Sequence, residues 1–126
     1  MDENGIGEII LGCALRVHRA LGPGLLENAY EACLAHEFEK NELPFQRQLV
    51  LPVLYDGQKV ELGYRLDLLV ADKVVVEVKA TDGVAGLHRA QVLSYLRLGH
   101  YRLGYVLNFN VSLMKDGVHR VVNGLR

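Results

Sequence analysis

Hydrophobic and polar positions follow two different periods along this chain. Between residues 5 and 21, and again between 25 and 41, apolar side chains recur every three or four positions, which predicts two amphipathic helices. The Gly-Pro-Gly sequence at 22–24 separates them. From 43 to 80 the pattern changes to short runs rich in Leu and Val, which indicates strands. The chain therefore begins with helices and continues into a sheet.

Turn residues and a later helix divide the rest of the chain. Pro52 interrupts the first strand, and Asp56-Gly57 is a signal for a tight hairpin. A third helix is predicted over 87–98, followed by an apolar strand over 101–109 and a short final strand near the C-terminus. The order is α-α-β-β-β-α-β plus that short strand. A helix between two apolar strands favours a parallel crossover, so the predicted fold is α/β, a mixed sheet flanked by helices on both faces.

The strand pair formed by 64–70 and 74–79 is strongly apolar, yet it contains four charged side chains. Alternate residues of a strand share a face, so each strand has one apolar face and one face that carries the charges. If the loop has three residues, Val70 pairs with Val74 and the two apolar faces coincide, whereas a loop of two residues places charge on the valine face. The pattern favours the longer loop. The apolar face of the first strand would then contain Tyr64, Leu66, Leu68 and Val70.

This register sets Asp67 directly opposite Glu77 and Arg65 opposite Lys79. Like charges that face each other destabilise a strand pair, unless a divalent cation and a phosphate lie between them. Asp67 and Glu77 would then supply hard oxygen ligands for Mg²⁺, joined by the backbone carbonyl of Val78, waters and substrate oxygens. Lys79 would stabilise developing negative charge. The alternative is a half-exposed hairpin with diagonal salt bridges.

Composition favours one soluble globular domain, residues 1–126, with a net charge of −1. The charge is unevenly spread, because residues 1–42 hold eight acids and three Lys or Arg, while 83–126 hold one acid and six Lys or Arg. A basic face for a polyanion is therefore compatible with the balanced total, although a solvated surface would show the same pattern. No apolar stretch is long enough to span a bilayer and the first residues are unlike a signal peptide, so the expected location is cytoplasmic and no membrane partner is expected.

Three segments resemble a known family. Asp67, nine intervening residues and then Glu77-Val78-Lys79 are similar to the core motif of the PD-(D/E)XK nuclease superfamily, with Leu66 in place of the proline. The segment GLLENAY at 24–30 resembles the signature of its GxxExxY branch, and HRAQVLSYLRL resembles the H-x-x-Q-x-x-x-Y pattern of its later helix. The similarity covers residues 6–123.

This resemblance implies a restriction-endonuclease-like core in α-β-β-β-α-β order, with one extra N-terminal helix. It also implies that Asp67 and Glu77 are metal ligands and that Lys79 is the catalytic lysine, with Mg²⁺ or Mn²⁺ as the cofactor. Glu27 would match an acidic residue that many members place on the first core helix. Gln91 would match the polar residue of the following helix, beside the site.

Five further side chains complete the candidate set. Glu27 lies in the first turn of its helix, where the helix dipole alone would favour a carboxylate. Gln91 lies on an apolar ridge, which predicts a buried amide bonded to Lys79 or to a water at the metal. Three residues are assigned to binding the nucleic-acid backbone: Arg65, His88 and Arg89. The alternative interpretation of His88 is an exposed histidine on the helix surface.

The predicted function is a metal-dependent nuclease that hydrolyses phosphodiester bonds, with DNA preferred over RNA as the partner. The main alternative is an inactive binding module of the same fold that contacts nucleic acid or protein. A structural or antitoxin-like partner protein is a third hypothesis, without a feature that favours it. The small size, with no appended DNA-reading element, also suggests a homodimer or a partner chain.

Overall fold

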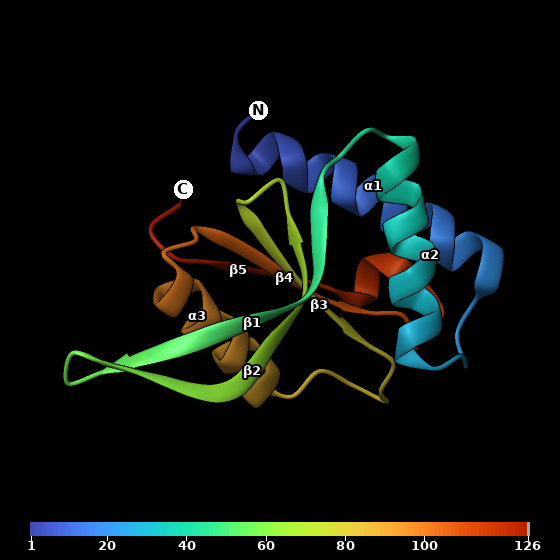
Figure 1. Cartoon of the computed structure of the whole chain (residues 1–126). Helices are drawn as coiled ribbons and strands as arrows, with labels where there is room; N and C mark the ends of the chain where they lie inside the picture. The colour runs from blue at the N-terminus through green and yellow to red at the C-terminus, as the bar shows by residue number, and fades with distance from the viewer. Residues whose placement is uncertain (126) are drawn as a thin grey trace.

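The protein forms a five-stranded sheet with three α-helices (Figure 1). A computed structural model describes residues 1–125, and the side chains of all of them except 61–63. The elements in chain order are α1 (Glu3–Leu21), α2 (Glu27–Lys40), β1 (Phe45–Tyr55), β2 (Gln58–Val70), β3 (Val74–Lys79), α3 (Gly86–Gly99), β4 (Leu103–Asn108), the 3₁₀ turn η1 (Met114–Gly117) and β5 (Val118–Val122). The predicted order of helices and strands is confirmed, including the short last strand.

The sheet is mixed, with strands in the order β1-β2-β3-β4-β5. All neighbours are antiparallel except β3 and β4, which are parallel and are joined through α3. The register of β1 against β2 shifts between Leu51 and Val53, where Pro52 cannot donate a ladder hydrogen bond. The predicted α/β class and the parallel crossover are therefore confirmed.

The two faces of the sheet carry separate hydrophobic cores. α1 and α2 cover one face and α3 covers the other (Figure 1). The larger core, beneath α1 and α2, includes Ile10, Tyr30, Phe38, Val76 and Phe109, all fully buried. The smaller core, beneath α3, is formed by Leu51, Leu66, Leu69, Val75, Val92, Leu96, Val106 and Val121. Among the described residues no helix is long and apolar enough to cross a membrane.

The β1–β2 hairpin changes sides part of the way along its length. Phe45 packs against the larger core, whereas Leu49, an even number of residues later, packs against the smaller one. Between them Gln48 has a φ of 53°, in the left-handed region that residues other than glycine rarely adopt. On the partner strand Leu68 lies in the larger core and Leu66 in the smaller. The outer half of the hairpin therefore runs beside α3 (Figure 1).

This change of side corrects one prediction. Tyr64 and Leu66 were expected to share a face with Leu68 and Val70, but the two pairs pack on opposite sides of the sheet. The alternation rule holds only within a regular strand, and here Gln48 has a left-handed backbone while Gln48 and Asp67 are absent from the strand pairs between Arg47–Leu68 and Leu49–Leu66.

Candidate active site

Asp67 and Glu77 meet where β2 and β3 separate. The ladder between these strands contains the pairs Val70 with Val74, Leu69 with Val75 and Leu68 with Val76. Beyond it, side chains replace the backbone partners. Glu77 Oε1 accepts a hydrogen bond from the Asp67 backbone N–H at 3.1 Å, and Asp67 Oδ2 accepts one from the Val78 N–H at 2.8 Å. The predicted three-residue loop is thus confirmed, and the two carboxylates converge.

Glu77 is in an environment that disfavours its charge. The residue is 8% exposed. Burial, followed by the nearby charge of Asp67, raises the pKa of the Glu77 carboxyl to about 8, while Lys79 acts in the opposite direction. Two adjacent carboxylates in a poorly solvated place require either a proton or a cation between them. This strand junction therefore favours either a proton on Glu77 or a cation beside it.

The donor set suits a hard divalent ion. Each carboxylate accepts a backbone hydrogen bond through one oxygen, Oδ2 in Asp67 and Oε1 in Glu77. Asp67 Oδ1 has a long contact with Gln48 Nε2, at 3.5 Å, and this contact would have to be exchanged for a metal if Oδ1 were a ligand. Among the described residues no group of three or more His, Cys, Asp or Glu side chains could hold a metal. Mg²⁺ is commonly held by one or two carboxylates and keeps several waters, so two acids fit Mg²⁺ better than a fully protein-ligated ion.

Lys79 and Val78 follow at the end of β3. Lys79 is half-buried and shares a strand face with Glu77, since the two are two residues apart. Its positive charge acts on the Glu77 carboxyl. Val78 is buried and holds Asp67 through its N–H. Its carbonyl remains a predicted metal ligand.

A buried acid on α2, absent from the sequence predictions, is connected to Asp67 through Gln48. Glu31 is 6% exposed and forms an ion pair with Arg47 of β1, with 2.9 Å between Arg47 Nη2 and Glu31 Oε2. Gln48 Nε2 donates to Glu31 Oε1 at 3.0 Å and lies 3.5 Å from Asp67 Oδ1. Glu31 is thus linked through Gln48 to the acidic pair. The polar run Gln-Arg-Gln inside an apolar strand was the one available sequence signal.

Glu27 occupies the predicted position in the first turn of α2. It is exposed and borders a hollow of about 400 Å³ together with Leu25, Leu26, Asn28 and Ala80. Ala80 directly follows Lys79, so Glu27 lies near the end of β3 that carries the lysine. A role for Glu27 in catalysis remains a prediction.

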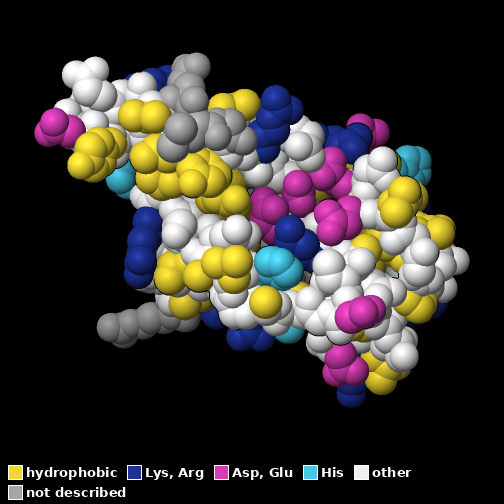
Figure 2. All heavy atoms as spheres, turned by 90° about the horizontal axis from the view of Figure 1, so that it is seen from below, with side chains coloured by type: hydrophobic (Ala, Val, Ile, Leu, Met, Phe, Trp, Pro, Cys, Tyr) yellow, Lys and Arg dark blue, Asp and Glu magenta, His cyan; other side chains and the backbone are white. Residues whose placement is uncertain are grey.

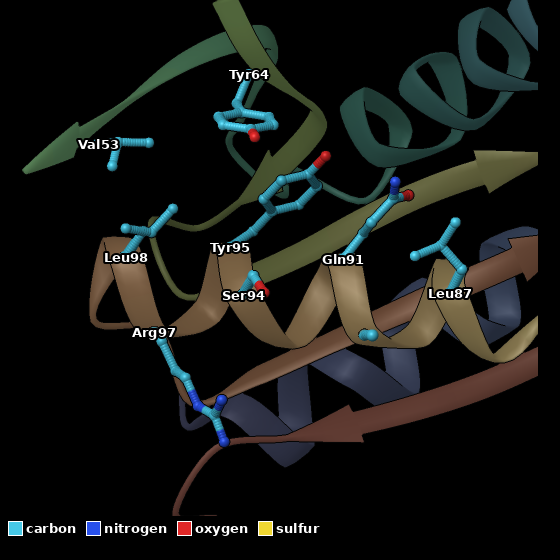
Figure 3. Close-up of a pocket in the computed structure, with 9 residues that line it drawn as sticks. Val53, Tyr64, Leu87, Gln91, Ser94, Tyr95, Arg97 and Leu98 are labelled. Atoms are coloured by element: carbon cyan, nitrogen blue, oxygen red, sulfur yellow. The ribbon is translucent and has the colours of Figure 1, made fainter. Parts of the chain in front are cut away.

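Gln91 is not the buried amide that its ridge predicted. It is exposed and lines a pocket with Tyr64 and Tyr95, as Figure 3 shows. The buried residues of α3 are Val92 and Leu96, one position further round the helix. Periodicity identified the apolar ridge but could not show that an open pocket, rather than a packed strand, lies above it.

The three candidate backbone-binding residues lie on two elements, Arg65 on β2 and the neighbours His88 and Arg89 on α3. Arg65 is exposed on β2, paired with Val50, and the β2–β3 ladder ends before the predicted pair with Lys79. Arg89 is exposed and lies 2.6 Å from Nδ1 of His119 on β5, away from β2. His88 is half-buried, which corrects the alternative of a fully exposed histidine.

The Nδ1 atom of His88 is buried without a hydrogen-bond partner among the described residues. Figure 2 shows acidic side chains gathered round a basic one, with a histidine beside them, on the face of the molecule seen from below. This face of the molecule therefore combines acidic side chains with a basic side chain and a histidine.

Comparison with known proteins identifies the superfamily of the chain. A search of curated proteins and a search of solved structures returned no significant match. The family model of the PD-(D/E)XK nuclease superfamily matches residues 4–121, nearly the whole chain. The chain belongs to the PD-(D/E)XK nuclease superfamily.

Proposed function

We propose that the protein is a metal-dependent nuclease that hydrolyses phosphodiester bonds, with DNA as the preferred substrate. The observation that carries this proposal is the convergence of Asp67 and Glu77 at the β2–β3 junction, with Lys79 on the same strand. A simple salt-bridged surface would interleave opposite charges, whereas this junction brings two carboxylates together.

Each residue has a distinct part in the proposed mechanism. Asp67 and Glu77, with the carbonyl of Val78, would hold Mg²⁺ or Mn²⁺, which when bound polarises the phosphate and lowers the pKa of a coordinated water. The Lys79 ammonium group stabilises negative charge that develops on the phosphate oxygens. In the proposal Glu27 of α2 and Gln91 of α3 orient water and substrate.

We also propose that the chain belongs to the GxxExxY branch. Gly24 has a φ of 102°, which favours glycine. The Tyr30 hydroxyl donates to the Gly22 carbonyl at 2.6 Å and accepts from the Leu25 N–H at 3.1 Å. Tyr30 also stacks on Phe109, with ring centroids 4.6 Å apart. In this interpretation the glycine and the tyrosine of the motif fix the loop that presents Glu27.

A cleavage assay tests the proposed activity. Single- and double-stranded DNA and RNA would be incubated with Mg²⁺, Mn²⁺ or EDTA. We expect metal-dependent cleavage, and a loss of about 100-fold or more in Glu77→Gln and in Lys79→Ala, because the first removes a charged metal ligand and the second removes the cation beside the phosphate. Two exposed residues provide matched controls, Glu39→Gln and Lys115→Ala, which should cleave like the wild type.

Two outcomes would contradict the proposal in different ways. Unchanged cleavage in both site variants would remove the assigned mechanism. No cleavage of any substrate, with nucleic-acid binding that does not depend on metal, would instead favour the inactive binding module. The homodimer remains a prediction, which light scattering would check.

A further inference from the structure

A pocket of about 530 Å³ lies between α3 and the outer half of the β1–β2 hairpin. Val53 and Tyr64 line it from the hairpin, and Leu87, Gln91, Tyr95 and Leu98 line it from α3 (Figure 3). Its volume is within the range of sites that bind small organic groups. The proposed mechanism makes no use of most of this pocket.

Two tyrosines give the pocket its aromatic surface. The rings of Tyr64 and Tyr95 are 6.0 Å apart between centroids and tilted by 54°, so they are not stacked face to face. Tyr64 is 43% exposed and Leu87 is 66% exposed, although both side chains are largely apolar. Aromatic faces that remain open in a groove are the surfaces on which nucleobases stack.

The polar groups of the pocket match an uncharged ligand. Gln91 presents an amide with both donors and an acceptor, the same complement as the edge of a base. Among the residues that line the pocket Arg97 is the one with a charge, and Figure 3 shows its side chain directed away from Tyr64 and Tyr95. A phosphate would have no cation to pair with inside the pocket. A neutral heterocycle could form hydrogen bonds with the Gln91 amide.

The pocket is next to the acidic pair. Tyr64 precedes Asp67 by three residues on β2, a separation of about 10 Å along a strand. A phosphate held at Asp67 and Glu77 can therefore have the base of a neighbouring nucleotide within reach of Tyr64 and Tyr95.

We propose that this pocket binds an unpaired nucleobase beside the scissile phosphate, so that the substrate is single-stranded or locally unpaired nucleic acid. This inference rests on the proposed nuclease function for the position of the phosphate. In a duplex each base is covered by its neighbours and its edge is paired, so it can enter the pocket only after it leaves the stack.

Fluorescence of 2-aminopurine tests the pocket without relying on cleavage. A single-stranded oligonucleotide that contains this base would be titrated in Ca²⁺ with the wild type and with Tyr64→Ala and Tyr95→Ala. We expect quenching on binding, and affinity weakened about tenfold in each variant, because one stacking surface is lost. Tyr64→Phe and Tyr95→Phe keep the ring and should bind like the wild type. Tyr55→Ala, an exposed tyrosine at the hairpin tip outside the pocket, is the matched control.

The corresponding duplex should bind at least tenfold more weakly than the single strand. Equal affinity for both, or no effect of the two alanine variants, would overturn the inference even if the protein cleaves nucleic acid. Quenching that depends on both tyrosines in a protein that cuts nothing would support the pocket while the nuclease proposal fails. A change of oligomeric state in Tyr64→Ala or Tyr95→Ala, measured by light scattering, would identify the surface as a contact between protein chains and would overturn the proposal.

Discussion

α1 and α2 seal their face of the sheet, whereas α3 leaves part of its own face open. α1 and α2 bury long side chains such as Ile10, Leu34 and Phe38 against the strands. On α3, Val92 and Leu96 are buried, while Leu87 and Tyr95 border a pocket. α1 and α2 therefore bury their apolar residues in the larger core, whereas α3 divides its apolar residues between the smaller core and the proposed base pocket.

The comparison predicts that the same type of truncation has very different effects on the two faces. Phe38→Ala should lower the free energy of unfolding by about 3–5 kcal/mol, because it leaves a cavity in the larger core. Leu87→Ala should change it by less than about 0.5 kcal/mol, because the side chain is already exposed. Urea unfolding followed by circular dichroism measures both. Equal losses would show that the α3 face is packed like the other.

The acidic pair at the β2–β3 junction should make stability depend on pH. The folded protein favours the protonated form of Glu77, whose pKa is raised from 4.5 to about 8. The unfolded chain releases this proton at lower pH, so the metal-free protein should lose stability as pH rises from about 4.5 to 8. We expect a loss on the order of 1–3 kcal/mol by pH 8.

Thermal unfolding in EDTA measures this effect, with Glu77→Gln as the test variant. The amide keeps an oxygen that can accept from the Asp67 N–H but carries no charge, so its profile should be flat over the same range. Mg²⁺ should restore the stability of the wild type at pH 8 and leave the variant unchanged. A wild-type stability that rises between pH 5 and 8 would contradict the assigned burial of Glu77.

The smallest expected difference concerns one hydroxyl on each face. Tyr30→Phe should lower the free energy of unfolding by about 1 kcal/mol, because the Gly22 carbonyl and the Leu25 N–H both lose a hydrogen-bond partner. Tyr95→Phe should leave the free energy of unfolding unchanged, because the Tyr95 hydroxyl borders an open pocket in which water can take its place. Chemical denaturation of both variants checks this pair, and a larger loss in Tyr95→Phe would reverse the distinction between the faces.

The sequence predicted the order of elements and the register of the central hairpin correctly. Both depend on local rules, since apolar periodicity identifies each element and the merging of the valine faces selects the loop before Val74. The same register led to the expectation that Asp67 lies opposite Glu77; the ladder ends one pair earlier, at Leu68 and Val76, and beyond it side chain to backbone hydrogen bonds link the two acids. Their roles in catalysis remain predictions.

Contacts that depend on tertiary structure could not be predicted in this way. The left-handed backbone of Gln48 has no sequence signal, because glutamine is not a residue that favours this region. The pairing of Glu31 with Arg47 joins a helix to a strand 16 residues later. The exposure of Gln91 depends on where the outer hairpin passes over α3. These features position the site, and each arises from the packing of distant segments.

The hydrogen bonds at the β2–β3 junction have a practical consequence for studying the site. The amide hydrogens of Asp67 and Val78 are held by carboxylate oxygens and not by the carbonyls of a neighbouring strand. Their rate of exchange with solvent therefore follows the charge and position of the two acids. NMR of these two backbone amides should therefore report the protonation of the acids and the binding of the proposed metal.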